Sequence, residues 1–190
     1  MKNWKFKLND NVINLKDGAN SIYVVGNTGS GKDVTVEALL ENTNREIDYV
    51  HVFEAFQHID VEHPIGIQED SVDNFAKVDA MNDFIEENQN DTHVVIIGHY
   101  DNYSDIQKDQ VKDIIRKYSK NHENVLIIVY SQKFRQEIAD LCAAKILLRN
   151  NPKELSYALG FAVKQDLSCG SGYYLSPLGD VTHITIPFVA

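Results

Sequence analysis

A loop with three glycines and a lysine is the part of this sequence best suited to chemistry. It consists of Gly26, Asn27, Thr28, Gly29, Ser30, Gly31, Lys32 and Asp33. The spacing follows the pattern G-x-x-x-x-G-K-[ST], in which backbone N–H groups surround nucleotide phosphates and the lysine reaches the β- and γ-phosphates. Glycine allows the backbone angles that such a tight turn needs. The loop therefore predicts a nucleoside triphosphate site held by these eight residues, with Lys32 at the terminal phosphates.

Asp33 departs from this pattern, because a carboxylate stands where a hydroxyl usually holds Mg²⁺. A carboxylate about 4 Å from a triphosphate costs about 4 kcal/mol per unit charge at an effective dielectric constant of about 20, unless a metal ion lies between them. Carboxylate oxygens are themselves good Mg²⁺ ligands, so Asp33 is a candidate metal ligand. The sequence predicts ATP and Mg²⁺ as cofactors and supports triphosphate binding more directly than hydrolysis. The alternative is a glycine-rich turn that binds nothing.

The segments around the loop predict the elements that position it. An apolar strand over 21–25 precedes the loop, and a helix over 32–42 follows it. Further strand and helix patterns alternate along the chain, which predicts an α/β fold with a mainly parallel central sheet flanked by helices. The expected strands are 49–54, 94–98, 125–131 and 144–148, and the expected helices are 71–88, 105–120 and 136–142. Alternation over 4–15 predicts an N-terminal hairpin, and residues 172–175 and 182–188 predict a C-terminal antiparallel hairpin.

Length and composition limit the class of protein. A chain of 190 residues with 43% hydrophobic residues can bury one core, so we expect a single domain over 1–190. Within it we expect the N-terminal hairpin in 1–20, the nucleotide-binding core in 21–150 and the closing hairpin in 170–190. No apolar run has the length of a membrane span, and two cysteines form no disulfide framework, which predicts a cytoplasmic protein without a membrane partner. The net charge of −10 does not favour general nucleic-acid binding.

With these elements in place, the chain resembles the motor domain of FtsK/HerA-type P-loop ATPases, a family of DNA translocases, conjugative coupling proteins and packaging ATPases. The likeness rests on the loop, on the strand 126–131 ending at Gln132, on the segment 138–149 and on the final blocks 170–177 and 186–189. It implies a RecA-like fold, ATP as ligand, a homo-oligomeric ring such as a hexamer, and double-stranded DNA as a partner. It also implies that Gln132 senses the γ-phosphate.

The chain departs from that family at two catalytic positions. The family's third strand ends in an Asp-Glu pair, whereas here it runs into Gly98, His99, Tyr100 and Asp101. His99 and Asp101 are therefore the candidate catalytic residues beside Lys32 and Gln132, although a histidine in this position also suits a structural role. No arginine stands just before the fourth strand, where the family supplies one in trans, and such an arginine is worth roughly 10³–10⁵ in rate in GTPases. The sequence thus predicts a slow ATPase or, alternatively, a hydrolysis-deficient assembly module.

Three weaker candidates remain open. Glu54 ends a strand and is a candidate acid. A stripe of basic residues repeats every four residues on one expected helix and suits either DNA contact or ordinary surface ion pairs with nearby aspartates. The stripe is Lys108, Lys112, Arg116 and Lys120. A scattered histidine set, His51, His58, His63, His93 and His99, raises a metal hypothesis without tight ligand spacing.

A small-molecule kinase is a third possible function, disfavoured because no lid segment is recognisable.

Overall fold

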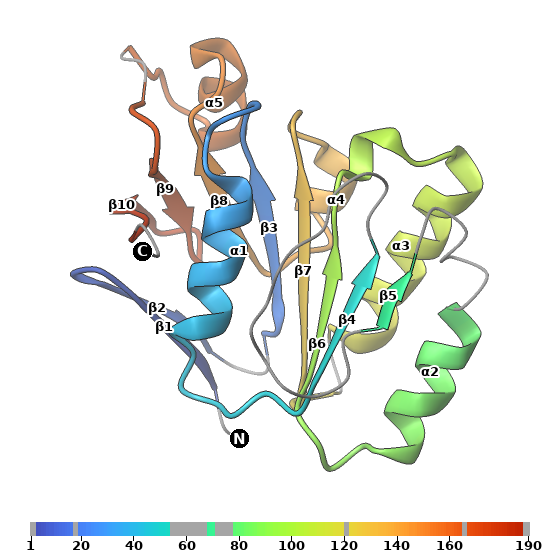
Figure 1. Ribbon diagram of the computed structural model, residues 1–190. Helices are drawn as coiled ribbons and strands as arrows, with labels where there is room; N and C mark the ends of the chain where they lie inside the picture. Colours follow the sequence, from blue (N-terminus) through green and yellow to red (C-terminus); the bar gives the residue numbers. More distant parts are fainter. Residues whose placement is uncertain are drawn as a thin grey trace.

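A computed structural model describes residues 3–16, 19–53, 68–70, 78–119, 122–164 and 167–187 of the chain (Figure 1). Its strands are β1 (Trp4–Leu8), β2 (Asn11–Leu15), β3 (Ser21–Val25), β4 (Tyr49–Phe53), β5 (Gln68–Asp70), β6 (His93–Ile97), β7 (Val125–Ser131), β8 (Ala144–Leu148), β9 (Ser171–Leu175) and β10 (Val181–Thr185). Its helices are α1 (Lys32–Glu41), α2 (Val78–Glu87), the 3-10 turn η2 (Tyr100–Asn102), α3 (Asp105–Tyr118), α4 (Gln136–Ala139) and α5 (Pro152–Leu159).

The central sheet is mainly parallel. Its strand order across the described residues is β10-β9-β8-β3-β7-β6-β4-β5. The six strands from β8 to β5 run parallel to their neighbours, while β9 and β10 are antiparallel and extend the β8 edge. This arrangement confirms the predicted α/β class and the C-terminal antiparallel hairpin. It also places β7 between β3 and β6, so the carboxyl ends of these three strands are neighbours.

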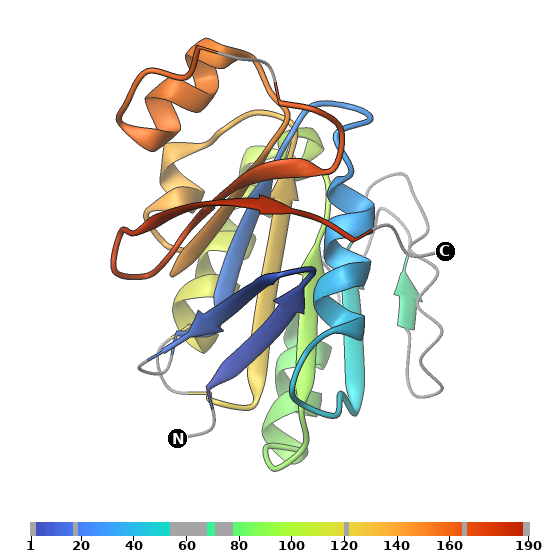
Figure 2. The same cartoon turned by 90° about the vertical axis from the view of Figure 1, so that its left-hand side faces the viewer.

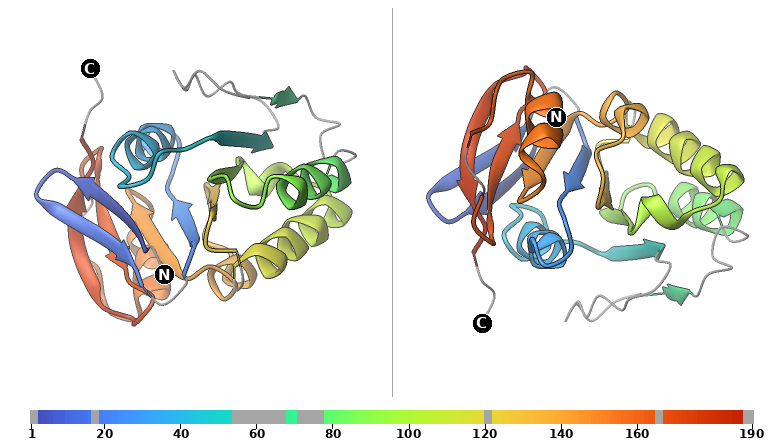
Figure 3. Two further views of the ribbon diagram at one scale, coloured as in Figure 1. Left: turned by 90° about the horizontal axis from the view of Figure 1, so that it is seen from below. Right: turned by 90° about the horizontal axis from the view of Figure 1, so that it is seen from above.

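The middle strands are buried on both faces. Every residue of β3, β6 and β7 is buried, as expected for continuous apolar runs inside a covered parallel sheet. Helix α1 lies on one face, and α2, α3 and α4 lie on the other (Figures 1 and 3). Two apolar clusters correspond to these faces, one shared by α1 and the N-terminal hairpin and the other by the remaining helices. The sheet therefore holds the loop between β3 and α1 on a rigid base.

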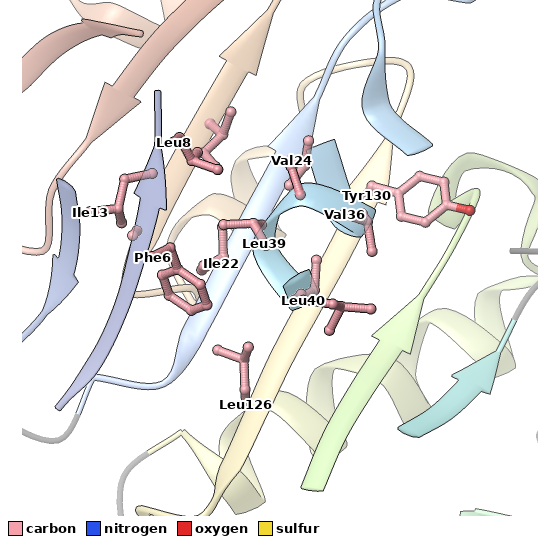
Figure 4. Packing of buried hydrophobic residues seen from close by; sticks show 14 of the residues in the cluster. Phe6, Leu8, Ile13, Ile22, Val24, Val36, Leu39, Leu40, Leu126 and Tyr130 are labelled. Carbon is pink, nitrogen blue, oxygen red and sulfur yellow. The ribbon is translucent and has the colours of Figure 1, made fainter. Parts of the chain in front are cut away.

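The N-terminal hairpin forms at the predicted place and is part of the core. Strands β1 and β2 pair in an antiparallel register from Trp4↔Leu15 to Leu8↔Asn11. Their inward side chains pack towards α1, β3 and β7 (Figure 4). The hairpin lies beside the C-terminal hairpin (Figure 2), and the Asn9 amide donates to the Thr185 carbonyl oxygen at 3.1 Å. The turn between β1 and β2 is thus joined directly to β10.

Several element bounds differ from the expectations. The helix expected over 136–142 ends at Ala139. The helix expected over 105–120 ends at Tyr118, and a capping box formed by Ser104 and Gln107 fixes its N-terminus. The expected strand 182–188 is observed at Val181–Thr185. Helix α2 is described from Val78, and residues 71–77 of its expected range lie outside the described residues. Neither β5 nor α5 was expected.

Candidate phosphate-binding site

The glycines of the loop are required by its geometry. Gly29 and Gly31 have φ angles of +69° and +93°, in the left-handed region that favours glycine. At Gly26 an added Cβ would overlap the Ser30 hydroxyl oxygen and approach the Leu148 Cβ atom to 2.9 Å. Each of the three positions therefore explains one glycine of the sequence pattern, and together they give the tight turn that joins β3 to α1.

The first turn of α1 has no side-chain cap. Gly31 is its N-cap residue. The first N–H groups of an α-helix have no acceptor within the helix. They point out of its N-terminus, where the helix dipole also favours negative charge. The tip of the loop, Asn27 to Gly29, is exposed, whereas Ser30 and Lys32 on either side of Gly31 are buried.

The Lys32 ammonium group lies inside the curve of the loop. Its Nζ atom donates hydrogen bonds to the carbonyl oxygens of Gly26, at 2.8 Å, and Asn27, at 3.1 Å. The side chain is buried, with 5% of its surface exposed. Burial lowers the pKa of Lys32, while the nearby carboxylates of Asp33 and Asp101 act in the opposite direction. The ammonium is thus held where the loop can bring it to a bound phosphate.

Two side-chain oxygen atoms at the loop have no hydrogen-bond partner among the described residues. They are the Oδ1 atom of Asp33 and the Oγ atom of Ser30, and both are buried. A buried carboxylate oxygen without a partner carries an electrostatic cost that a cation relieves. Oxygen is also the ligand type that Mg²⁺ prefers. The residues present therefore fit a phosphate group accompanied by a divalent cation.

Three chain segments border the loop. The Gly26 N–H donates to the Ser131 carbonyl at the end of β7, at 3.2 Å, and the Asn27 N–H donates to the Arg149 carbonyl after β8, at 2.9 Å. The carbonyl oxygen of Gly29 accepts from the Arg149 guanidinium at 3.2 Å and from the Cys169 thiol at 3.3 Å. The sequence indicated Arg149 only as the end of the family-like segment 138–149 and gave Cys169 no role at the loop. The sheet order brings the end of β8 and the segment before β9 to the loop, and no local pattern specifies that order.

The side chain of Gln132 reaches the loop. Its Nε2 atom donates to the Thr28 hydroxyl at 3.1 Å. Asp101 lies beside it, in η2 after β6, and each of its carboxylate oxygens is engaged. Oδ2 accepts from the N–H groups of Gln132, at 2.7 Å, and Lys133, at 3.1 Å. Oδ1 accepts from Arg135 at 2.8 Å. The structure therefore brings Lys32, Gln132 and Asp101 to one end of the sheet.

His99 follows β6 in a left-handed backbone conformation, with φ at 50°. Its ring packs edge-on against the Tyr130 ring, with the ring centres 5.3 Å apart. A non-glycine residue with positive φ carries backbone strain that the surrounding structure has to support. His99 and Asp101 occupy the end of the strand at which the resembled family has its two acids.

The remaining candidates have simpler surroundings or lie beyond the described part. On α3, Lys112 pairs with Asp109 and Arg116 pairs with Asp113, each at 2.9 Å, which supports the surface ion-pair interpretation. Glu54, His58, His63 and Lys120 lie outside the described residues. Among the residues that are described, no group of three or more potential ligands is arranged to hold a metal ion, and no helix is long and apolar enough to cross a membrane.

The sequence matches no protein-family model and no curated protein. Solved structures with a similar fold include ATPases 2 and 3 of EssC from Geobacillus thermodenitrificans, with a TM-score of 0.73 and 16% identity over 95% of this chain. The cytoplasmic domain of the type VII secretion ATPase EccC from Thermomonospora curvata has a TM-score of 0.69 and 13% identity over 98% of this chain. This chain spans 39% of that EssC structure and 26% of that EccC structure.

A smaller protein shares the fold over nearly its whole length. The genome packaging NTPase B204 from Sulfolobus turreted icosahedral virus 2, solved in complex with sulfate, matches with a TM-score of 0.60 and 12% identity. The match covers 90% of this chain and 98% of that one. These likenesses agree with the resemblance inferred from the loop, Gln132 and the closing hairpin. The chain therefore has the fold shared by these secretion ATPase domains and this packaging NTPase.

Proposed function

We propose that this protein binds ATP with Mg²⁺ in the loop 26–33 and acts as the motor core of a DNA-translocating or packaging assembly. The observation that carries the nucleotide proposal is the glycine-dependent loop with Lys32 inside its curve. Lys32 and the N–H groups at the start of α1 would bind the phosphates, and Asp33 would hold the cation. The bound Mg²⁺ would neutralise phosphate charge. Gln132 would report the γ-phosphate through its position beside Thr28.

The fold shared with secretion and packaging ATPases supports the proposed motor role. It includes a homo-oligomeric ring, such as a hexamer, double-stranded DNA as the substrate moved, and a cytoplasmic location where ATP is available. His99 would serve as the proton acceptor for water, because no carboxylate follows β6 directly. The Asp-Glu pair of the resembled family is missing after β6. This favours an alternative function, a nucleotide-gated assembly module that has the motor fold but does not hydrolyse ATP.

The nucleotide proposal is tested by Lys32→Ala. Removing the ammonium group should reduce binding of a fluorescent ATP analogue by at least tenfold, since one hydrogen bond to a charged group is worth about 1.5–3 kcal/mol. Lys7→Ala, on the exposed face of β1, removes the same charge far from the loop and should leave the affinity unchanged. Equal affinity of Lys32→Ala and the wild type would refute the assignment.

The motor and the rival module are separated by turnover and assembly. If the protein is a motor, ATP with Mg²⁺ should promote oligomers in light scattering, and double-stranded DNA should raise phosphate release. ATP-dependent assembly without phosphate release would support the module instead. A strict monomer at saturating nucleotide and high protein concentration would contradict both.

A further inference from the structure

The loop between β7 and α4 is held by side chains at every backbone N–H group from Gln132 to Arg135. Those of Gln132 and Lys133 donate to Asp101, as described above. The Phe134 N–H donates to the Glu154 carboxylate at 3.0 Å, and the Arg135 N–H donates to the Tyr23 hydroxyl at 3.1 Å. Four consecutive amides without regular secondary structure are thus fixed from outside. The loop that carries Gln132 has a defined shape before any ligand binds.

Asp101 accepts hydrogen bonds from two of these four N–H groups and also forms an ion pair with Arg135. Its side chain is 16% exposed and pairs with Arg135, whose side chain is 37% exposed, at 2.8 Å. The hydrogen bond to Asp101 raises the pKa of Arg135 further. Hydrogen bonds to an ionised carboxylate are roughly twice as strong as neutral ones. Both oxygens of the Asp101 carboxylate therefore accept hydrogen bonds from backbone or guanidinium N–H groups of the protein.

We propose that Asp101 is a positioning residue that sets Gln132 against Thr28, and that it thereby fixes how the site distinguishes a triphosphate from a diphosphate. The inference rests on the proposed nucleotide function. Asp101 accepts a hydrogen bond from the backbone N–H of Gln132, and the side chain of Gln132 donates to the Thr28 hydroxyl at 3.1 Å. A displacement of the Gln132 backbone therefore moves its amide group away from the γ-phosphate position, and small displacements at a reacting centre weaken an interaction strongly.

If only the charge of Asp101 mattered, removing that charge would strengthen ATP binding. The Asp101 carboxylate lies close enough to Lys32 to raise the pKa of that ammonium group. Removing a negative charge near a triphosphate reduces repulsion and should strengthen binding. If Asp101 positions Gln132, its removal should instead weaken ATP binding selectively. The two explanations therefore differ in sign.

The test compares ATP and ADP affinities in four variants. Asp101→Asn keeps the size of the side chain and removes its charge, Gln132→Ala removes the sensor, and the double variant combines them. Asp113→Asn is the matched control, because Asp113 is an exposed partner of Arg116 on α3. For Asp101→Asn we expect ATP affinity to fall about tenfold with ADP affinity changed less than twofold, the size of one charged hydrogen bond. In the Gln132→Ala background the same change should have no further effect on the ratio of affinities.

The outcomes separate this inference from the proposed function. If the wild type binds neither nucleotide, the proposed function fails, and the positioning role fails with it. If the wild type prefers ATP and Gln132→Ala removes that preference, while Asp101→Asn behaves like Asp113→Asn or binds ATP more tightly, only the positioning role is overturned. Additive effects of Asp101→Asn and Gln132→Ala would overturn it as well.

A second variant keeps the test valid if Asp101→Asn does not fold. Arg135→Met removes the cation and leaves Asp101 with its two backbone donors, so the ATP preference should fall by a smaller factor. The side-chain amide NMR signal of Gln132 should move in Arg135→Met and stay in place in Asp113→Asn. An unmoved signal together with an unchanged ATP preference would overturn the inference.

Discussion

The two cysteines differ sharply in their surroundings. Cys142 is 3% exposed, and burial raises the pKa of its thiol to about 12. Cys169 is exposed, and its sulfur lies 3.3 Å from the Gly29 carbonyl of the phosphate loop. Because the thiolate is the reactive form, a buried thiol of high pKa reacts slowly. Cys169 is therefore a natural probe of the loop.

We expect a thiol reagent such as DTNB to modify one cysteine in the native protein and both in denaturant. ATP with Mg²⁺ should slow the native reaction several-fold, because a phosphate in the loop restricts access to Cys169. The rate is followed by absorbance, and Cys169→Ser should remove the fast phase. A native rate unaffected by saturating ATP in a protein that binds it would contradict the placement of Cys169 beside the ligand.

Single residues were predictable where their role is local. Gly26, Gly29, Gly31 and Lys32 belong to one short stretch whose backbone geometry follows from its own sequence. The contact of Asp101 with the Gln132 backbone depends instead on β7 lying between β3 and β6, which no local pattern specifies. Asp101 was accordingly expected as a catalytic acid, while its engagement with Arg135 became visible only in three dimensions.

At the scale of elements, two histidines join β4 to β6. The His93 Nε2 atom lies 3.0 Å from the Asn88 carbonyl, so this nitrogen carries the hydrogen. His93 Nδ1 then accepts from His51 Nε2 at 3.3 Å. The rings of Tyr49 on β4 and Phe84 on α2 pack against the pair. This cluster fixes α2 on the sheet.

The His51 environment predicts a stability loss in mild acid. Burial, with a further contribution from His93, lowers the pKa of His51 from 6.5 to about 4. The unfolded chain therefore binds a proton before the folded chain does, and stability falls as the pH drops from 6.5 towards 4. Between pH 7 and pH 5 this group accounts for about 2 kcal/mol of unfolding free energy. Urea unfolding at both pH values measures the loss, which His51→Gln should reduce, and an identical pH slope in that variant would exclude His51 as the cause.

Elements were predictable where apolar periodicity is strong. The buried strands are mostly apolar runs, and α1 was expected from its place directly after the glycine-rich loop; all were found within a residue or two of the expected bounds. Helix α5 was missed although its ends carry clear signals, an Asn151 cap with Pro152 in the first turn and Gly160 after the last. Strand β5 was missed because three polar residues at the sheet edge, Gln68–Asp70, lack any strand pattern.

At the scale of the molecule, the N-terminal hairpin closes the face of the sheet that carries α1. Its inward residues Trp4, Phe6 and Leu8 are almost completely buried, whereas Val12 on the outer side is 67% exposed. The hydrogen bond from Asn9 to Thr185 also ties it to the C-terminal hairpin. Stability of the central sheet and α1 should therefore depend on a segment far from the loop 26–33.

We expect Phe6→Ala to lower the free energy of unfolding by about 3–5 kcal/mol, the usual cost of removing a buried phenyl ring. Val12→Ala, in the same hairpin, should change it by less than about 0.5 kcal/mol. Urea denaturation followed by circular dichroism measures both. Similar small losses in the two variants would show that the hairpin is not part of the cooperative core.

The two carbonyl bonds of Lys32 have a kinetic consequence. Without nucleotide, the Lys32 ammonium group already donates hydrogen bonds to two carbonyl oxygens of its own loop. An arriving phosphate therefore replaces these carbonyl oxygens as the acceptor and does not have to order a disordered segment. Entry of the ligand should then be one step, with an observed rate that rises linearly with nucleotide concentration in stopped-flow fluorescence. A rate that levels off would reveal a slow rearrangement before or after capture.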